Sequence, residues 1–161
     1  MGLKSKKRRE YKGDYDATVL EQWKTCVEMA NSNTEKRTNA NNIFITINSA
    51  LFAVITFALD YKSILLSAIG IIVCILWLNT IKSYRKLSDV KFAIVNEIEK
   101  LLPLSPFTHE WSELQATRYV GLTKIEKILP WLFLVLYVVS ILWPLVEMLP
   151  SLTCHCVGGA Q

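Results

Sequence analysis

The chain has 161 residues, of which 52% are hydrophobic and only 20% are charged, with a formal net charge of +4. A chain of this length is normally a single domain, but its apolar residues are gathered into long uncharged runs rather than spread as stripes. This composition excludes a disordered chain, a secreted disulfide-rich protein and an ordinary cytosolic enzyme, and it indicates a small integral membrane protein.

The first 15 residues are basic and polar, and we predict that they are disordered. No apolar run follows them at the spacing of a cleavable signal peptide. We interpret their cations as determinants of topology that also attract anionic lipid at the membrane surface. Binding to RNA or DNA is the minor alternative, and no stable binding is expected, because no recognition fold accompanies the cluster. The cations assigned to the membrane surface are Lys4, Lys6, Lys7, Arg8 and Arg9.

An amphipathic cytoplasmic helix is predicted over residues 16–41, with Asp16 as its N-cap. Residues 17–59 contain neither glycine nor proline, so this helix is expected to continue without a break into the first span. Its apolar side repeats at helical spacing through Leu20, Trp23, Val27 and Ala30.

Three charge-free segments are long enough to cross the hydrocarbon core, which takes about 20 residues of α-helix. A turn of three residues between the first two segments predicts an antiparallel hairpin. A cytoplasmic helical region over residues 82–127 precedes the third segment, and residues 148–161 are expected to form an external tail. The predicted transmembrane helices are residues 42–59, 63–81 and 128–147.

The distribution of Lys and Arg predicts the orientation of the chain. Nine of these residues precede the first span, one lies between the first two spans, eight lie between the second and third, and none follows the third. The positive-inside rule therefore places the N-terminus in the cytoplasm and the C-terminus outside. Aromatic anchors are predicted at the membrane surfaces, namely Trp77, Trp131, Tyr61 and Trp143.

The first span carries a face of small and polar residues, which we call the polar face. Its members follow one another at intervals of three or four positions and are Thr38, Asn42, Thr46, Ser49, Ala53 and Thr56, with Asn48 beside them. We interpret it first as a helix–helix interface, because small residues let membrane helices approach closely. The alternative is that it faces water in the lumen of an oligomer. The second span has a similar series, interpreted as the groove that receives the first span: Ser63, Ser67, Gly70 and Cys74.

Nothing in the sequence indicates an enzyme, a metal site or a bound cofactor. The interiors of the spans contain no charge, and Glu147 lies at the external end of the third span, which argues against a coupled transporter. No phosphate-binding, hydrolase or dinucleotide motif occurs. Cys154, His155 and Cys156 supply too few ligands for a closed metal site, so Cys154 and Cys156 are interpreted as incidental thiols or as a link between subunits. Four acids are interpreted as solvated surface residues, namely Glu97, Glu99, Glu110 and Glu113.

A series of short motifs extends over roughly residues 20–146. The motifs are Arg37-Thr38-Asn39-Ala40-Asn41-Asn42-Ile43-Phe44, Trp77, Ser83-Tyr84-Arg85, Lys91-Phe92, Glu97 and Glu99, Leu102-Pro103, Pro106, Glu110-Trp111, Leu122-Thr123 and Ile125-Glu126. Their order and spacing resemble the RipA-like family of small octameric bacterial membrane proteins. That family is similar to the pore-like membrane accessory proteins encoded beside Cas13b-type (type VI-B CRISPR) ribonucleases, which depolarise the inner membrane during phage infection. The resemblance implies an octameric ring in the bacterial inner membrane and transfers no catalytic residue.

The sequence thus predicts an all-α integral membrane protein with three transmembrane helices and amphipathic cytoplasmic helices, assembled as a symmetric homo-oligomeric ring. A pore that permeabilises or depolarises the membrane is the leading hypothesis for its function. The alternative is a scaffold that recruits a cytoplasmic partner without conduction. The expected partners are membrane lipid, further copies of the chain and a cytoplasmic trigger or partner protein.

Overall fold

The computed structural model describes residues 6–57, 62–117 and 122–154, and every regular element in these ranges is a helix. Three helices are long and apolar enough to cross a membrane, which confirms the predicted all-α membrane class. The elements are η1 (Arg8–Glu10), α1 (Tyr15–Phe57), α2 (Lys62–Glu99), α3 (Pro106–Ala116), α4 (Leu122–Glu126) and α5 (Ile128–Cys154).

The chain forms two compact units. Unit 1 consists of Met1–Asn39 and Lys82–Leu122, and unit 2 consists of Ala40–Ile81 and Thr123–Gln161. Helices α1 and α2 contribute to both units, whereas α3 belongs to unit 1 and α5 to unit 2. Unit 2 therefore contains the charge-free segments of all three long helices.

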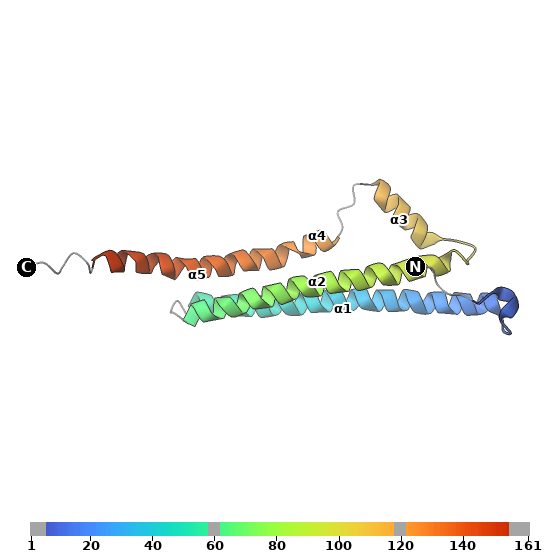
Figure 1. Ribbon diagram of the computed structural model, residues 1–161, viewed down its shortest axis with the longest axis horizontal. Coiled ribbons are helices and arrows are strands. Elements are labelled where there is room, and N and C mark those ends of the chain that lie inside the picture. Colours follow the sequence, from blue (N-terminus) through green and yellow to red (C-terminus); the bar gives the residue numbers. More distant parts are fainter. Residues whose placement is uncertain (1–5, 58–61, 118–121, 155–161) are drawn as a thin grey trace, which may run out of the picture. The chain divides into compact units, whose positions relative to one another are not determined.

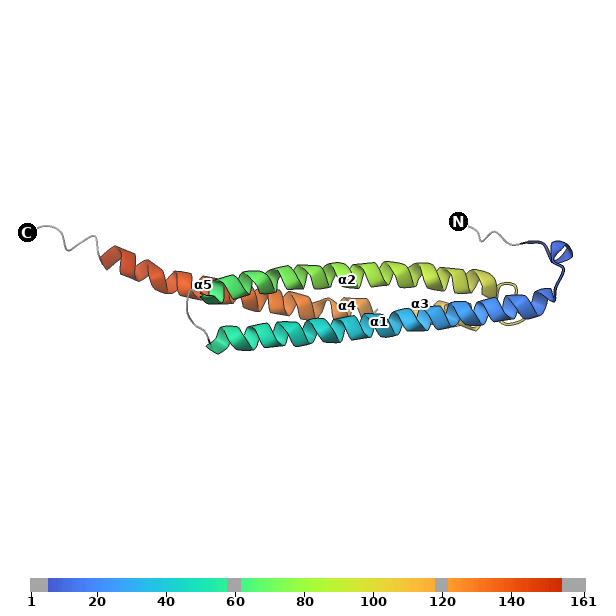
Figure 2. The ribbon, with the colours of Figure 1, turned by 90° about the horizontal axis from the view of Figure 1, so that it is seen from below.

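Helices α1 and α2 run antiparallel and side by side (Figures 1 and 2). A series of buried or half-buried residues extends along the whole of α2. The interval between successive members alternates between four and three residues, which gives the 3.5-residue period of coiled coils. This period keeps one narrow side of α2 turned towards its neighbours over 38 residues. The series is Ser63, Ser67, Gly70, Cys74, Trp77, Ile81, Tyr84, Ser88, Lys91, Val95 and Ile98.

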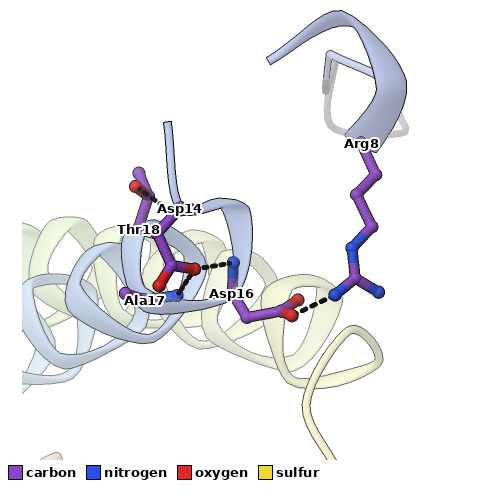
Figure 3. Close-up of polar contacts among 5 residues, drawn as sticks. All are labelled: Arg8, Asp14, Asp16, Ala17 and Thr18. Atoms are coloured by element: carbon purple, nitrogen blue, oxygen red, sulfur yellow. Dashed lines mark hydrogen bonds and ion pairs between the residues drawn. The ribbon is translucent and has the colours of Figure 1, made fainter. Parts of the chain in front are cut away.

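The first helix is capped by Asp14, so the predicted cap at Asp16 is wrong. Asp14 Oδ1 accepts hydrogen bonds from the backbone N–H groups of Asp16 and Ala17, each at 3.1 Å (Figure 3). The Thr18 hydroxyl donates to the Asp14 carbonyl oxygen at 2.7 Å. Asp16 instead forms an ion pair with Arg8, and this pair ties η1 to the beginning of α1.

The third apolar helix is interrupted at Lys127, between α4 and α5. Pro130 lies one turn further on and has no backbone N–H to donate to the carbonyl of residue 126, and its ring crowds that turn. The interruption is therefore the expected consequence of a proline in the first turn of α5, where Pro130 is buried.

Candidate functional site

A fully buried amide joins the three long helices of unit 2. Asn48 on α1 has no exposed surface, and its Nδ2 donates to the Phe44 carbonyl oxygen at 2.8 Å. Its Oδ1 accepts from the Tyr137 hydroxyl of α5 at 3.1 Å and from the Cys74 thiol of α2 at 3.3 Å. A polar group away from water must find protein partners, and α1, α2 and α5 each supply one. We call Asn48, Cys74 and Tyr137 the Asn48 node.

Gly70 makes room for the aromatic ring in this node. A Cβ atom at Gly70 would lie 2.4 Å from the Tyr137 ring, a distance that no side chain can tolerate. The ring of Phe52 on α1 lies edge-on to Tyr137, with the ring centroids 6.4 Å apart. The small-residue groove of α2 therefore receives α5 at Gly70 and α1 at Cys74, so the prediction that it receives only the first span is wrong.

Trp77 is 1% exposed, so its interpretation as an anchor at the membrane surface is wrong. Its indole N–H donates to Asn41 Oδ1 at 2.9 Å, and its ring stacks on Phe44 with the centroids 5.7 Å apart. The other two described anchors, Trp131 and Trp143, are 56% and 65% exposed. The fourth, Tyr61, lies outside the described residues.

The polar face of α1 is exposed on the single chain along its whole length. Among the described residues, no member of this face packs into the interior; the six exposed residues are Thr38, Asn42, Thr46, Ser49, Ala53 and Thr56. At about 100° per residue, this face is separated both from the side of α1 that carries Asn48 and from an exposed apolar side that carries Ile43, Ile47 and Val54. Helix α1 thus has three sides within unit 2: one buried, one apolar and one polar.

The threonines of the polar face already satisfy their hydroxyl protons. Thr38, Thr46 and Thr56 each donate to a carbonyl oxygen of α1 itself, at 3.1, 2.9 and 2.7 Å. This back-bonding lets a threonine lie in an apolar environment at low cost. Asn42 and Ser49 form no such bond among the described residues. Their amide and hydroxyl are the groups of this face that need water or another chain.

Glu99 organises unit 1, and its interpretation as a solvated surface acid is wrong. The side chain has no exposed surface, and its carboxylate accepts the backbone N–H groups of Phe107 and Thr108, each at 3.0 Å, and the Thr108 hydroxyl at 2.8 Å. Burial would raise the pKa of Glu99, but these hydrogen bonds outweigh it and hold the pKa below its ordinary value. Glu99 therefore caps α3 as an anion.

The packing of unit 1 supports this cap. The Phe107 ring lies between Trp23 of α1 and Phe92 of α2, with centroid distances of 5.9 and 6.4 Å. A partly buried hydrogen bond of 2.8 Å from the Asn33 amide to the Ser88 hydroxyl joins α1 and α2. The other three acids named above, Glu97, Glu110 and Glu113, are exposed as predicted.

Of the cations assigned to the membrane surface, Lys6, Lys7, Arg8 and Arg9 are exposed around η1, and Lys4 lies outside the described residues. The contacts of η1 with α1 contrast with the disorder predicted for residues 1–15. Within the described ranges no three His, Cys, Asp or Glu side chains gather as metal ligands would. His155 and Cys156 lie outside those ranges.

The model of the octameric membrane protein family (8xMP) matches residues 20–146. The match contains α2, α3 and α4 completely, together with most of α1 and α5. None of the curated proteins and none of the solved structures matches the chain significantly.

Proposed function

The chain belongs to the octameric membrane protein family, whose name implies self-association in a membrane, and from this premise we propose that it forms a ring with a water-filled opening lined by the polar face of α1. The single observation that carries the proposal is the exposure of this face on the isolated chain. In symmetric rings one surface recurs in every subunit, so a polar strip on one chain becomes a polar lining in the assembly.

The division of α1 into three sides supports this arrangement. The Asn48 side of α1 already packs against α2 and α5 of the same chain. The apolar side, with Ile43 and Val54, suits lipid tails or a neighbouring subunit. Ser49 lies within the first span and Asn42 at its cytoplasmic end, and neither side chain has a partner within the described chain, which is costly for a polar group in hydrocarbon. Water in a lumen satisfies both groups in every subunit.

The proposed activity is passive and not enzymatic. The buried polar contacts at the Asn48 node join an amide, a thiol and a phenol, and all three groups are uncharged. An open ring of this kind dissipates the membrane potential without a cofactor. We place it in the bacterial inner membrane with the N-terminus cytoplasmic and the C-terminus external, following the Lys and Arg distribution. The Lys and Arg residues of the N-terminal segment then lie in the cytoplasm, at the start of α1.

The biological setting of the proposal comes from the resemblance to the accessory proteins of Cas13b-type systems. This resemblance assigns the ring to antiphage defence, in which it depolarises the infected cell. A cytoplasmic trigger or partner protein, acting on unit 1, opens the ring.

The lining is tested by cysteine accessibility in an otherwise cysteine-free background that still forms the oligomer. A charged, membrane-impermeant thiol reagent is expected to modify Ser49→Cys, because this position faces water. Val54→Cys is the matched control, since Val54 is exposed but lies on the apolar side of α1. Equal protection of both positions from the reagent contradicts a water-filled lumen lined by this face.

Conduction is tested with a voltage-sensitive dye in cells that express the protein. The double variant Asn42→Leu/Ser49→Leu is expected to abolish depolarisation while keeping the oligomer, whereas Val54→Leu retains both. A protein that never depolarises cells under any trigger, with lipid or side chains filling the opening, contradicts the pore.

A scaffold is the second candidate, and the exposure of Trp111 favours it. This residue lies on α3 in unit 1 and is 56% exposed, as expected of an anchor for a protein partner. Trp111→Ala is expected to abolish a scaffold function and to spare conduction. Trp23 is unsuitable for this test because its ring packs against Phe107, so its removal damages unit 1.

A further inference from the structure

A pocket of about 380 Å³ lies in unit 1, between the N-terminal segment and the end of α2. Its volume is within the range of about 300–1,000 Å³ that is typical of small-molecule sites. Val19 and Ile98, both buried, form an apolar floor. Polar and aromatic side chains surround this floor, among them Lys6, Tyr11, Tyr15, Thr18, Glu97 and Lys100.

Two tyrosines form an ordered aromatic wall. The rings of Tyr11 and Tyr15 meet edge to face, with their centroids 6.2 Å apart. The Tyr11 hydroxyl lies 3.2 Å from the Thr18 hydroxyl, within hydrogen-bond distance. Gly13 permits this fold, because a Cβ atom there would lie 2.9 Å from the Tyr11 ring. The wall therefore offers flat apolar rings together with hydroxyl donors.

The charges at the rim leave one cation uncompensated. Glu97 and Lys100 are joined by a hydrogen bond of 2.5 Å and neutralise each other. This bond and the positive charge of Lys100 hold the pKa of Glu97 below its ordinary value, so Glu97 remains an anion. Lys6 forms no ion pair within the described part of the chain. Its ammonium group is available to an anion in the pocket.

We propose that this pocket binds a small ligand that joins an aromatic ring to a phosphate, namely a nucleotide. The base lies on the apolar floor of Val19 and Ile98 and against the tyrosine rings, because aromatic side chains stack on any base. The phosphate accepts hydrogen bonds from the Lys6 ammonium and from the hydroxyls at the rim. The site goes beyond the proposed pore, and it is tested by binding rather than by conduction.

The test is isothermal titration calorimetry on the full chain in nanodiscs of zwitterionic lipid. The probes are the mononucleotides AMP, GMP, CMP and UMP, with adenosine and inorganic phosphate as the separate halves of one of them. At least one mononucleotide is expected to bind saturably. Where AMP binds, its affinity should be about tenfold higher than that of adenosine or of inorganic phosphate. Absence of saturable binding by every mononucleotide overturns the proposal, as does binding of inorganic phosphate that equals nucleotide binding.

Three variants locate the site. Lys6→Ala and Tyr15→Leu are each expected to weaken nucleotide binding about tenfold. Lys12→Ala removes the same charge from the same segment but lies outside the pocket lining, so its affinity should match that of the unaltered chain. Lys6 is exposed, so its variant keeps the fold even if Tyr15→Leu does not. Equal affinities of Lys6→Ala and Lys12→Ala overturn the assignment to this pocket.

Discussion

Asn48 in unit 2 and Glu99 in unit 1 are both fully buried polar side chains that join different helices, but only one of them is an acid. Asn48 is neutral and accepts from a phenol and a thiol. Glu99 accepts from two backbone N–H groups and a hydroxyl at the start of α3. A buried charge needs strong, convergent donors, which a helix N-terminus supplies. In unit 2 an uncharged amide joins the helices, and its burial costs less desolvation free energy than burial of a carboxylate.

The largest expected effect comes from overfilling the node in unit 2. Gly70→Val is expected to destabilise the protein by about 3 kcal/mol, the upper end of the usual cost of overpacking, because its side chain overlaps the Tyr137 ring. Denaturant unfolding in detergent measures this loss. Adding Tyr137→Leu to the Gly70→Val variant should recover part of the stability, and a double variant as unstable as the single one contradicts the contact.

In unit 1, Glu99→Ala is expected to cost about 2 kcal/mol, since it leaves buried donors of α3 without an acceptor. Hydrogen exchange at the amides of Phe107 and Thr108 should accelerate strongly. Glu110→Ala removes an exposed acid from α3 itself and serves as the matched control, with exchange close to that of the unaltered chain. Similar exchange in both variants contradicts the role of Glu99 as the cap.

Acid should loosen unit 1 through the same group. The native pKa of Glu99 is lowered, so its stabilisation is complete above the ordinary value of 4.5 and is lost as the pH falls through the native pKa. Protection of the α3 amides, corrected for intrinsic exchange, is therefore expected to fall at acid pH while the α1–α2 amides of unit 2 keep theirs. The Glu99→Gln variant should lack this pH dependence; if it keeps it, another group is responsible.

The smallest effect is expected from removing the neutral amide. Asn48→Leu should cost about 1 kcal/mol, because interhelical hydrogen bonds in membranes contribute about 0.6 kcal/mol on average and two neighbouring donors lose their acceptor. Thr46→Val is the control, since its hydroxyl bonds only to α1 itself, and its unfolding free energy should scarcely change. A cost for Asn48→Leu that exceeds that of Glu99→Ala reverses the ranking of the two units.

Much of the molecule could be predicted from hydropathy and helical period. The all-helical membrane class follows from three uncharged runs, because hydrocarbon accepts few other backbone structures. The polar face of α1 is equally visible, since residues three or four positions apart must share a side of a helix. It is harder to predict which of two nearby residues caps a helix, because Asp14 and Asp16 are both suitable N-caps. Only the fold of the N-terminal segment makes Asp14 the cap and pairs Asp16 with Arg8.

The sequence by itself therefore determined which segments are helices, which of them are apolar and which side of α1 is polar, because these properties depend on neighbours along the chain. Only the tertiary structure decided that Asn48 faces α2 and α5, that Gly70 lies under Tyr137, that Trp77 is buried and that Glu99 caps α3. Each of these contacts joins residues on different helices. Their pairing depends on how the helices pack against each other, which periodicity within one helix does not specify.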